Sequence, residues 1–266
     1  MGRGRPNAQA HGVCVKVEAP RTGTARAREA HVAAGYVLHS YPFRETSLIV
    51  EFFTRSHGRV GVMAKGARRP KSALRGALMA FQPMQLTWSG KSELKTLHGV
   101  DWEAGHLQLQ GLQLICGFYV NELLLKLVPR EDPHEGLYAA YEQAIHALRD
   151  GTKPARLLRR FERELLREMG YELLLERDVD GQPVQPQVEY AFQIERGPVR
   201  LSNNGAAPGL RVRGKTLLDL SRNLEEVDED GLTDQEGRTL MRQAIGHYLN
   251  GQELRTRQLL RELQDL

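Results

Sequence analysis

Short runs that alternate apolar and polar residues fill the first part of the chain, from about residue 34 to residue 102. Turn-forming groups such as Tyr41-Pro42 and Ser56-His57-Gly58 separate several of these runs. The pattern predicts five strands, over residues 34–41, 47–54, 59–64, 83–89 and 94–102. Five short strands in about 70 residues are typical of a small closed barrel. We expect an OB-fold, with an SH3-like barrel as the alternative.

Two adjacent aromatic residues in the second predicted strand bear on this barrel. Successive residues of a strand point to opposite faces, so only one of Phe52 and Phe53 can fill a barrel interior. The other one needs a separate cover on the outside.

After Gly105 the spacing of apolar residues changes to the period of an α-helix. Helices are predicted within residues 106–129 and over 133–149, 154–169, 216–223 and 235–249. In the first helix we expect a buried stripe made of Leu107, Leu114, Phe118 and Leu125. Thr233, with Glu236 three residues later, has the spacing of a capping box at the start of the last helix.

These elements give a domain plan. Residues 1–30 mix Gly, Pro, Ala, Thr and Arg without periodicity, and we interpret them as a flexible basic arm. Residues 31–105 form the barrel, and residues 106–266 form a mainly helical domain. A small β and loop insertion is expected at about 171–210, with one possible strand over 188–195. The predicted fold class is α+β.

Charge is distributed unevenly, although the net charge is only +4. Residues 31–100 hold ten Lys or Arg and three Asp or Glu. The residues after position 100 hold 21 Lys or Arg and 28 Asp or Glu. A basic part joined to an acidic part suits a protein that binds a polyanion through one and other proteins through the other.

The composition excludes several classes of protein. Hydrophobic residues make up 41% and charged residues 26% of the chain, which argues against wholesale disorder. Cys14 and Cys116 are the only cysteines and neither lies in a C-x-x-C pair, so a disulfide framework is excluded and a zinc ribbon is disfavoured. No apolar run approaches the roughly 20 residues of a membrane span, and no signal peptide core is present. We expect a cytoplasmic protein.

A loop over residues 66–76 is the strongest local signal for nucleic-acid binding, because it places four cations within eight positions. Phosphates attract long cationic side chains, and each neutralised phosphate adds affinity through counterion release. Unpaired bases also need aromatic rings on which to stack, and Phe43 is our candidate. The predicted DNA-binding residues are Arg44, Arg59, Lys65, Arg68, Arg69, Lys71, Arg75, Lys91, Lys95 and Phe43.

Residues 209–216 read GLRVRGKT and satisfy the G-x-x-x-x-G-K-T phosphate-loop pattern. Such a loop must follow a buried strand and open a helix within a parallel sheet. The preceding residues 202–208 are polar, and no later apolar strand ends in an Asp that could hold magnesium. We therefore expect Gly214 and Thr216 to help start a helix.

Other catalytic and metal patterns fail. His134-Glu135 begins like a zinc-protease motif, but Tyr138 stands where the second histidine would be. No G-x-S-x-G segment presents a nucleophile. We expect no catalytic residue, no bound metal and no cofactor.

The third predicted helix carries five arginines around an apolar stripe. They could form a solvated face crossed by salt bridges with neighbouring glutamates. Alternatively, Arg159, Arg160 and Phe161 could border a small apolar groove that binds an acidic peptide ending in an aromatic residue and a free carboxylate.

Residues 36–54, YVLHSYPFRETSLIVEFFT, closely resemble the beginning of the bacterial RecO family of recombination mediators. The resemblance continues in Gly58-Arg59-Val60, in residues 64–68 and 94–97, in residues 119–124 and in Arg159-Arg160-Phe161-Glu162. It covers about residues 33–262 and leaves the basic arm outside.

The resemblance implies an N-terminal OB-fold, a helical C-terminal domain and no enzymatic activity. It further implies binding of single- and double-stranded DNA, annealing of complementary strands, contact with the acidic tail of single-stranded-DNA-binding protein, and cooperation with RecR in loading RecA. Such a protein acts at the nucleoid. Some relatives hold zinc through four cysteines after the third helix, but residues 171–201 contain none, so we expect no zinc.

Two other functions stay open from the residues alone. An OB-fold can bind RNA as well as DNA, and nothing in this sequence reports on the 2′-hydroxyl. A phosphate-loop hydrolase is the less favoured alternative.

Overall fold

The structure, a computed structural model, describes residues 14–18, 30–103, 108–201, 207–222 and 231–264. The chain forms two compact units. The first contains Met1–Gln108 and Arg130–Pro133, and the second contains Leu109–Pro129 and His134–Leu266. A segment of four residues thus belongs to the first unit although helices of the second precede and follow it in the sequence.

Five strands of the first unit close into a barrel, as predicted: β2 (His31–Phe43), β3 (Ser47–Thr54), β4 (Gly58–Ala64), β5 (Met84–Ser89) and β6 (Lys95–Glu103). Their order around the barrel is β6-β4-β3-β2-β5, and β5 also pairs with β6. All neighbours are antiparallel except β4 and β6, which run parallel. This arrangement fits the expected OB-fold.

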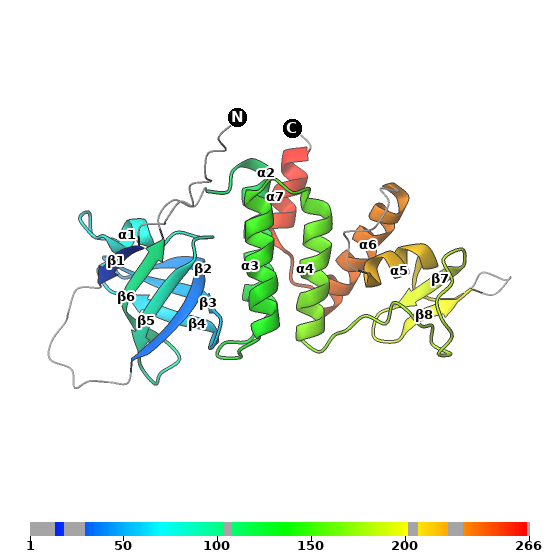
Figure 1. The fold of residues 1–266 in the computed structure, drawn as a ribbon, viewed down its shortest axis with the longest axis horizontal. Helices are drawn as coiled ribbons and strands as arrows, with labels where there is room; N and C mark the ends of the chain where they lie inside the picture. The colour runs from blue at the N-terminus through cyan, green and yellow to red at the C-terminus, as the bar shows by residue number, and fades with distance from the viewer. Residues whose placement is uncertain (1–13, 19–29, 104–107, 202–206, 223–230, 265–266) are drawn as a thin grey trace, which may run out of the picture. The chain divides into compact units, whose positions relative to one another are not determined.

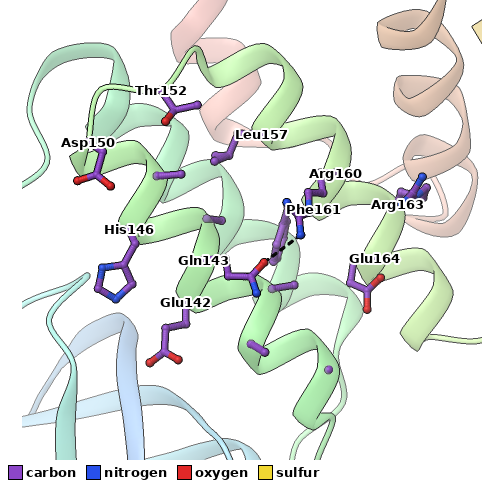
Figure 2. A pocket seen from close by; sticks show the side chains of 15 residues that line it. Glu142, Gln143, His146, Asp150, Thr152, Leu157, Arg160, Phe161, Arg163 and Glu164 are labelled. Atoms are coloured by element: carbon purple, nitrogen blue, oxygen red, sulfur yellow. Dashed lines mark hydrogen bonds between the residues drawn. The ribbon is translucent and has the colours of Figure 1, made fainter. Parts of the chain in front are cut away.

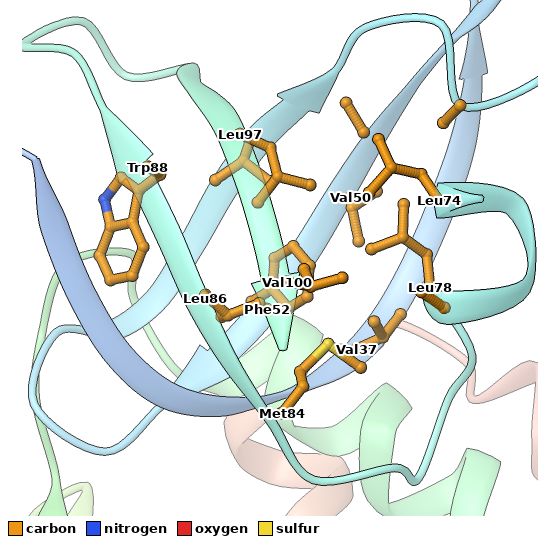
Figure 3. Packing of buried hydrophobic residues seen from close by; sticks show 14 of the residues in the cluster. Val37, Val50, Phe52, Leu74, Leu78, Met84, Leu86, Trp88, Leu97 and Val100 are labelled. Atoms are coloured by element: carbon orange, nitrogen blue, oxygen red, sulfur yellow. The ribbon is translucent and has the colours of Figure 1, made fainter. Parts of the chain in front are cut away.

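The interior of the barrel is filled by alternate residues of its strands. Val50 and Phe52 of β3 point inward and pack with Leu86, Trp88 and Val100 of β5 and β6 (Figure 3). Phe53 is fully buried as well but is not part of this cluster. The prediction that only one of the two phenylalanines fills the interior is therefore confirmed.

Residues within the expected flexible arm correct the prediction for residues 1–30. Strand β1 (Cys14–Glu18) pairs antiparallel with β6, and Val17 is buried in the barrel core. Five residues are too few to show a period in the sequence. The strand forms because of its hydrogen-bonded ladder with β6, which lies far away in the chain. Residues 1–13 and 19–29 of the predicted arm lie outside the described part of the chain.

The second unit begins with three long helices: α2 (Gly111–Leu127), α3 (Glu135–Arg149) and α4 (Pro154–Glu168). Helices α3 and α4 lie side by side (Figure 1). One face of α3 is buried and includes Leu137, Tyr141, Ala144, Ile145 and Leu148.

A small antiparallel sheet follows, with strands β7 (Glu189–Gln193), β8 (Gly197–Arg200) and β9 (Leu210–Arg213) in the order β8-β7-β9. The predicted strand over residues 188–195 corresponds to β7, whereas β8 and β9 were not predicted. The chain continues with helices α5 (Gly214–Ser221), α6 (Gly231–Tyr248) and α7 (Arg255–Gln264). None of the described helices is long and apolar enough to span a membrane.

The buried face of α2 differs from the predicted stripe. Phe118 is 41% exposed and Leu125 is half-buried, while Leu107 lies outside the described residues. The buried residues are instead Cys116, Gly117, Tyr119, Val120, Asn121, Leu123 and Leu124. Apolar residues surround this helix on nearly every side, so their spacing does not select one face.

The expected capping box of α6 is wrong, because the helix already begins at Gly231. Thr233 therefore lies inside the helix. The carboxylate of Glu236 instead accepts hydrogen bonds from the backbone N–H of Arg213 and from the hydroxyl of Thr216. It thereby satisfies donors at the start of the neighbouring helix α5.

A tight turn before β4 positions the segment 130–133. Gly58 has a φ of +62°, and a Cβ on it would lie 2.1 Å from the carbonyl oxygen of Asp132. Only glycine permits both this backbone conformation and this approach.

We predict that Gly58→Ala lowers the free energy of unfolding by about 2 kcal/mol or more, through left-handed strain and the steric overlap with Asp132. Both tryptophans of the chain, Trp88 and Trp102, lie in β5 and β6, so their fluorescence in a urea titration reports on the barrel.

The control is Gly76→Ala in helix α1 (Leu74–Ala77), where a Cβ meets nothing within 4 Å. This variant should be as stable as the wild type or slightly more stable. Equal losses in the two variants would contradict the steric explanation.

Candidate functional site

The outer face of strands β2, β3 and β4 carries the first candidate site. Because Val50 and Phe52 point inward, their neighbours in β3 point outward. Ile49 pairs with Tyr41 of β2 on one side and with Met63 of β4 on the other. In an OB-fold the face of the second and third strands, with the loops joining strands one to two and four to five, binds oligonucleotides. Here those strands are β3 and β4.

The turn between β2 and β3 is joined to the predicted basic loop by two hydrogen bonds. The backbone N–H of Arg68 donates to the carbonyl oxygen of Thr46 over 2.8 Å. The guanidinium of Arg68 donates to the backbone carbonyl oxygen of Arg44 over 3.1 Å. Arg44 has a φ of 51° and its guanidinium lies 5.3 Å from the centre of the Phe43 ring. The fold therefore brings Phe43, Arg44 and Arg68 together at one end of the outer face.

The remaining cations of the loop accompany Arg68. Arg69, Lys71 and Arg75 are exposed, and Lys65 is half-buried where the loop leaves β4. Lys91 is exposed in the turn between β5 and β6, the second loop that OB-folds use. We call the residues Arg44, Lys65, Arg68, Arg69, Lys71 and Arg75 the basic rim.

Arg59 and Lys95 have a different environment from the rim. Arg59 lies 3.5 Å from the carboxylate of Glu51, whose side chain is 3% exposed. The ammonium of Lys95, 10% exposed, pairs with Glu131 and donates to the carbonyl oxygen of Ser92. These two cations are engaged within the first unit, and we leave them out of the proposed DNA surface.

Arg130 joins the ion pair of Arg59 and Glu51. The sequence did not indicate this residue, because it is distant in the chain from the barrel strands. It pairs with both Glu51 and Glu93. Hydrogen bonding to Glu51 raises the pKa of Arg130, whereas burial lowers the pKa of Arg59. The backbone N–H of Glu131 donates to the carbonyl oxygen of Arg59, which adds segment 130–133 to the edge of β4.

The second candidate site is an open groove between α3 and α4 with a volume of about 670 Å³ (Figure 2). Phe161 and Leu157 of α4 face small residues of α3, so the groove has an apolar floor. Arg160 lies beside it, and its guanidinium donates to the side-chain oxygen of Gln143 over 3.1 Å. The small residues of α3 are Gly136, Ala139, Ala140, Ala144 and Ala147.

The two walls of the groove differ in charge. One wall carries Glu142 and His146 of α3 and Asp150 at the C-terminal end of that helix, whereas Arg160 and Arg163 project from α4 (Figure 2). Burial lowers the pKa of Arg163, which donates to the carbonyl oxygens of Leu220 and Arg222.

Glu164 also lines the groove from α4. Hydrogen bonds from Arg167 hold its pKa below the ordinary value. The basic wall therefore contains a carboxylate that Arg167 already neutralises.

Arg159 does not line the groove, although it was predicted beside Arg160 and Phe161. Its guanidinium binds both carboxylate oxygens of Glu162, at 2.6 and 2.9 Å, and Glu162 is fully buried. The hydroxyl of Tyr119 also donates to Glu162, over 2.6 Å. The salt bridge between Arg159 and Glu162 thus fits the first alternative for α4, but it is buried and not solvated, because Glu162 joins α4 to α2.

The phosphate-loop pattern at residues 209–216 does not form a loop. Four of its residues are strand β9, antiparallel to β7, and α5 begins at Gly214. A backbone committed to a strand ladder cannot cradle phosphates with its N–H groups. Among the described residues, no group of three or more His, Cys, Asp or Glu side chains is placed to hold a metal ion.

Comparison with known proteins gives matches over most of the chain. Residues 30–105 match the family described as "Recombination protein O N terminal", and residues 108–258 match "Recombination protein O C terminal". The chain is 52% identical over 232 residues to the DNA repair protein RecO of Nitrosospira multiformis, which covers 87% of this chain and 95% of that protein.

Two further similar proteins carry the same name. The protein of Dechloromonas aromatica is 49% identical over 234 residues, covering 87% of this chain and 95% of its own length. The protein of Burkholderia pseudomallei is 46% identical over 249 residues, covering 93% of this chain and 90% of its own length.

We predict that Glu51→Ala lowers the free energy of unfolding of the barrel by about 3 kcal/mol, because it leaves Arg59 and Arg130 without their shared buried anion. Tryptophan fluorescence during urea unfolding measures the loss. Glu93→Ala is the control, since Glu93 pairs with the same Arg130 but is 79% exposed, and it should change stability by less than about 0.5 kcal/mol. Similar effects of both variants would argue against a buried network.

Proposed function

The chain belongs to the RecO family of DNA repair proteins, and we propose that it acts in repair as a non-enzymatic DNA-binding protein and recombination mediator. It would bind single- and double-stranded DNA through its barrel. The observation that carries this proposal is the basic rim, joined by the Arg68 hydrogen bonds to the turn between β2 and β3. That turn joins the first two barrel strands and is one of the loops through which OB-folds bind oligonucleotides, and the exposed cations of the rim suit phosphates.

The family resemblance supplies the finer parts of the proposal. These are annealing of complementary strands, RecR as a partner, and the loading of RecA onto DNA coated with single-stranded-DNA-binding protein. The groove between α3 and α4 supports a peptide contact within this scheme. Its apolar floor at Phe161 suits an aromatic side chain, and Arg160 suits a terminal carboxylate. We therefore propose the groove as the site for the acidic tail of single-stranded-DNA-binding protein.

We predict that binding of a labelled oligonucleotide is strongly salt-dependent. Several phosphate contacts give a log-log slope of affinity against salt of about −3 or steeper. Charge reversal of Arg68, Arg69 and Lys71 to Glu together should weaken binding of all sequences alike and flatten the slope. A salt-independent wild-type affinity would exclude the proposed interface.

The control reverses Arg196, Arg200 and Arg242, three exposed arginines of the second unit. It changes the net charge by the same amount, so an equal loss would show that overall charge, and not the rim, determines binding. Competition between DNA and RNA oligomers of one sequence decides whether RNA is the better ligand.

We predict that a synthetic acidic peptide ending in Phe binds the second unit, and that Arg160→Ala weakens this binding about tenfold by removing a charge-assisted hydrogen bond. Isothermal titration calorimetry measures the change. Arg156→Ala, one turn earlier on α4 and outside the groove, should leave the affinity unchanged.

Arg159→Ala separates two explanations. Because Arg159 binds the buried Glu162, its loss should lower thermal stability more than peptide affinity. A variant that folds normally but no longer binds the peptide would instead place Arg159 in the site.

A further inference from the structure

An apolar band crosses the outer face of the barrel beside the basic rim. Tyr41 of β2, Ile49 of β3 and Met63 of β4 are direct cross-strand neighbours and share this face. His39 and Phe43 lie two residues before and after Tyr41, so they point the same way along β2. We call these five residues the outer band.

The side chains of the outer band are at least partly accessible to solvent. Tyr41 is 44% exposed, His39 is exposed, and Phe43, Ile49 and Met63 are half-buried. The rings of His39 and Tyr41 meet edge to face with their centres 4.4 Å apart. These side chains add nothing to the barrel interior, which is filled from the opposite face of the same strands.

The positive charges next to the outer band lie at one end of it, where they can attract a polyanion. Arg44 and Arg68 lie at the end next to Phe43. Two carboxylates come from the same strands and turn. Glu51 is paired with Arg59 and Arg130, so Glu45 in the exposed turn is the remaining anion there.

We propose that the outer band binds unpaired nucleobases by stacking while the basic rim binds the phosphates of the same strand. This inference rests on the proposed DNA-binding function and extends it from the backbone to the bases. Base stacking on aromatic rings tolerates any sequence, because every base has a π-face. A face with rings beside cations is the combination that single strands require, whereas a duplex needs only the cations.

Bases that stack on the outer band can still pair with a complementary strand. Stacking occupies the flat face of a base and leaves its pairing edge open. A complementary strand can therefore pair with bases held on the band. In the resulting duplex the bases stack on one another, so they leave the band and the strand remains bound only through its phosphates.

Fluorescence anisotropy with three labelled ligands of equal length tests this inference. The ligands are a thymidine oligonucleotide, the same phosphodiester chain without bases, and a duplex. The full-length wild type should bind the thymidine strand roughly tenfold more tightly than the abasic strand, the effect of about one stacked base. Tyr41→Ala should remove this preference and leave the affinities for the abasic strand and the duplex unchanged.

Two variants serve as controls. Tyr41→Phe keeps the ring and should keep the preference. Tyr171→Ala removes a tyrosine of similar exposure, 42%, from the second unit, and it should also keep the preference. Thermal unfolding of each variant verifies that the barrel is intact.

Three results would overturn the inference. A wild-type preference that survives in Tyr41→Ala places the stacking elsewhere. Salt-dependent binding without any preference for bases refutes the band but leaves the proposed DNA-binding function standing. Absence of binding to all three ligands refutes both.

Discussion

Alternation along the closed barrel is the constraint on which the candidate interface depends. Since Val50 and Phe52 fill the interior, Ile49 and its cross-strand neighbours are forced to the outside. A one-residue shift of register would exchange the two sets and move apolar core residues into water. The free energy that stabilises the core therefore also fixes the residues presented to a ligand. Packing on the inner face of the strands therefore also determines which residues make up the outer band.

The cations of the barrel divide into two groups according to their surroundings. Arg59, Arg130 and Lys95 have carboxylate partners within the unit, and their removal from water is compensated by those partners. The exposed cations of the basic rim keep their hydration and counterions. A phosphate can displace those counterions with a gain in entropy, whereas a cation already paired with Glu51 offers much less. Cationic residues near a binding face are thus not equivalent.

Local sequence patterns predicted the features that depend on neighbouring residues. The five barrel strands, most of the helices and the basic loop follow from alternation, helical spacing and turn residues. The misplaced features depend on long-range contacts. Strand β1 is too short to show a period, and Arg130 reaches Glu51 from 79 positions away in the chain. Glu162 is buried only because Tyr119 and Arg159 supply its hydrogen bonds. A helical wheel cannot reveal those partners.

The residues after position 100 carry more acidic than basic side chains, which by itself would disfavour the proposed binding of an acidic tail there. Screening resolves the conflict, because the Debye length is about 8 Å at physiological ionic strength. A peptide in the groove responds to the nearest charges and hardly to the sum over the unit. One wall of the groove carries Glu142 of α3 and Asp150 at the end of that helix, and the other carries Arg160 of α4. The acidic wall repels a peptide carboxylate and the basic wall attracts it, so the two walls together favour one orientation of the tail.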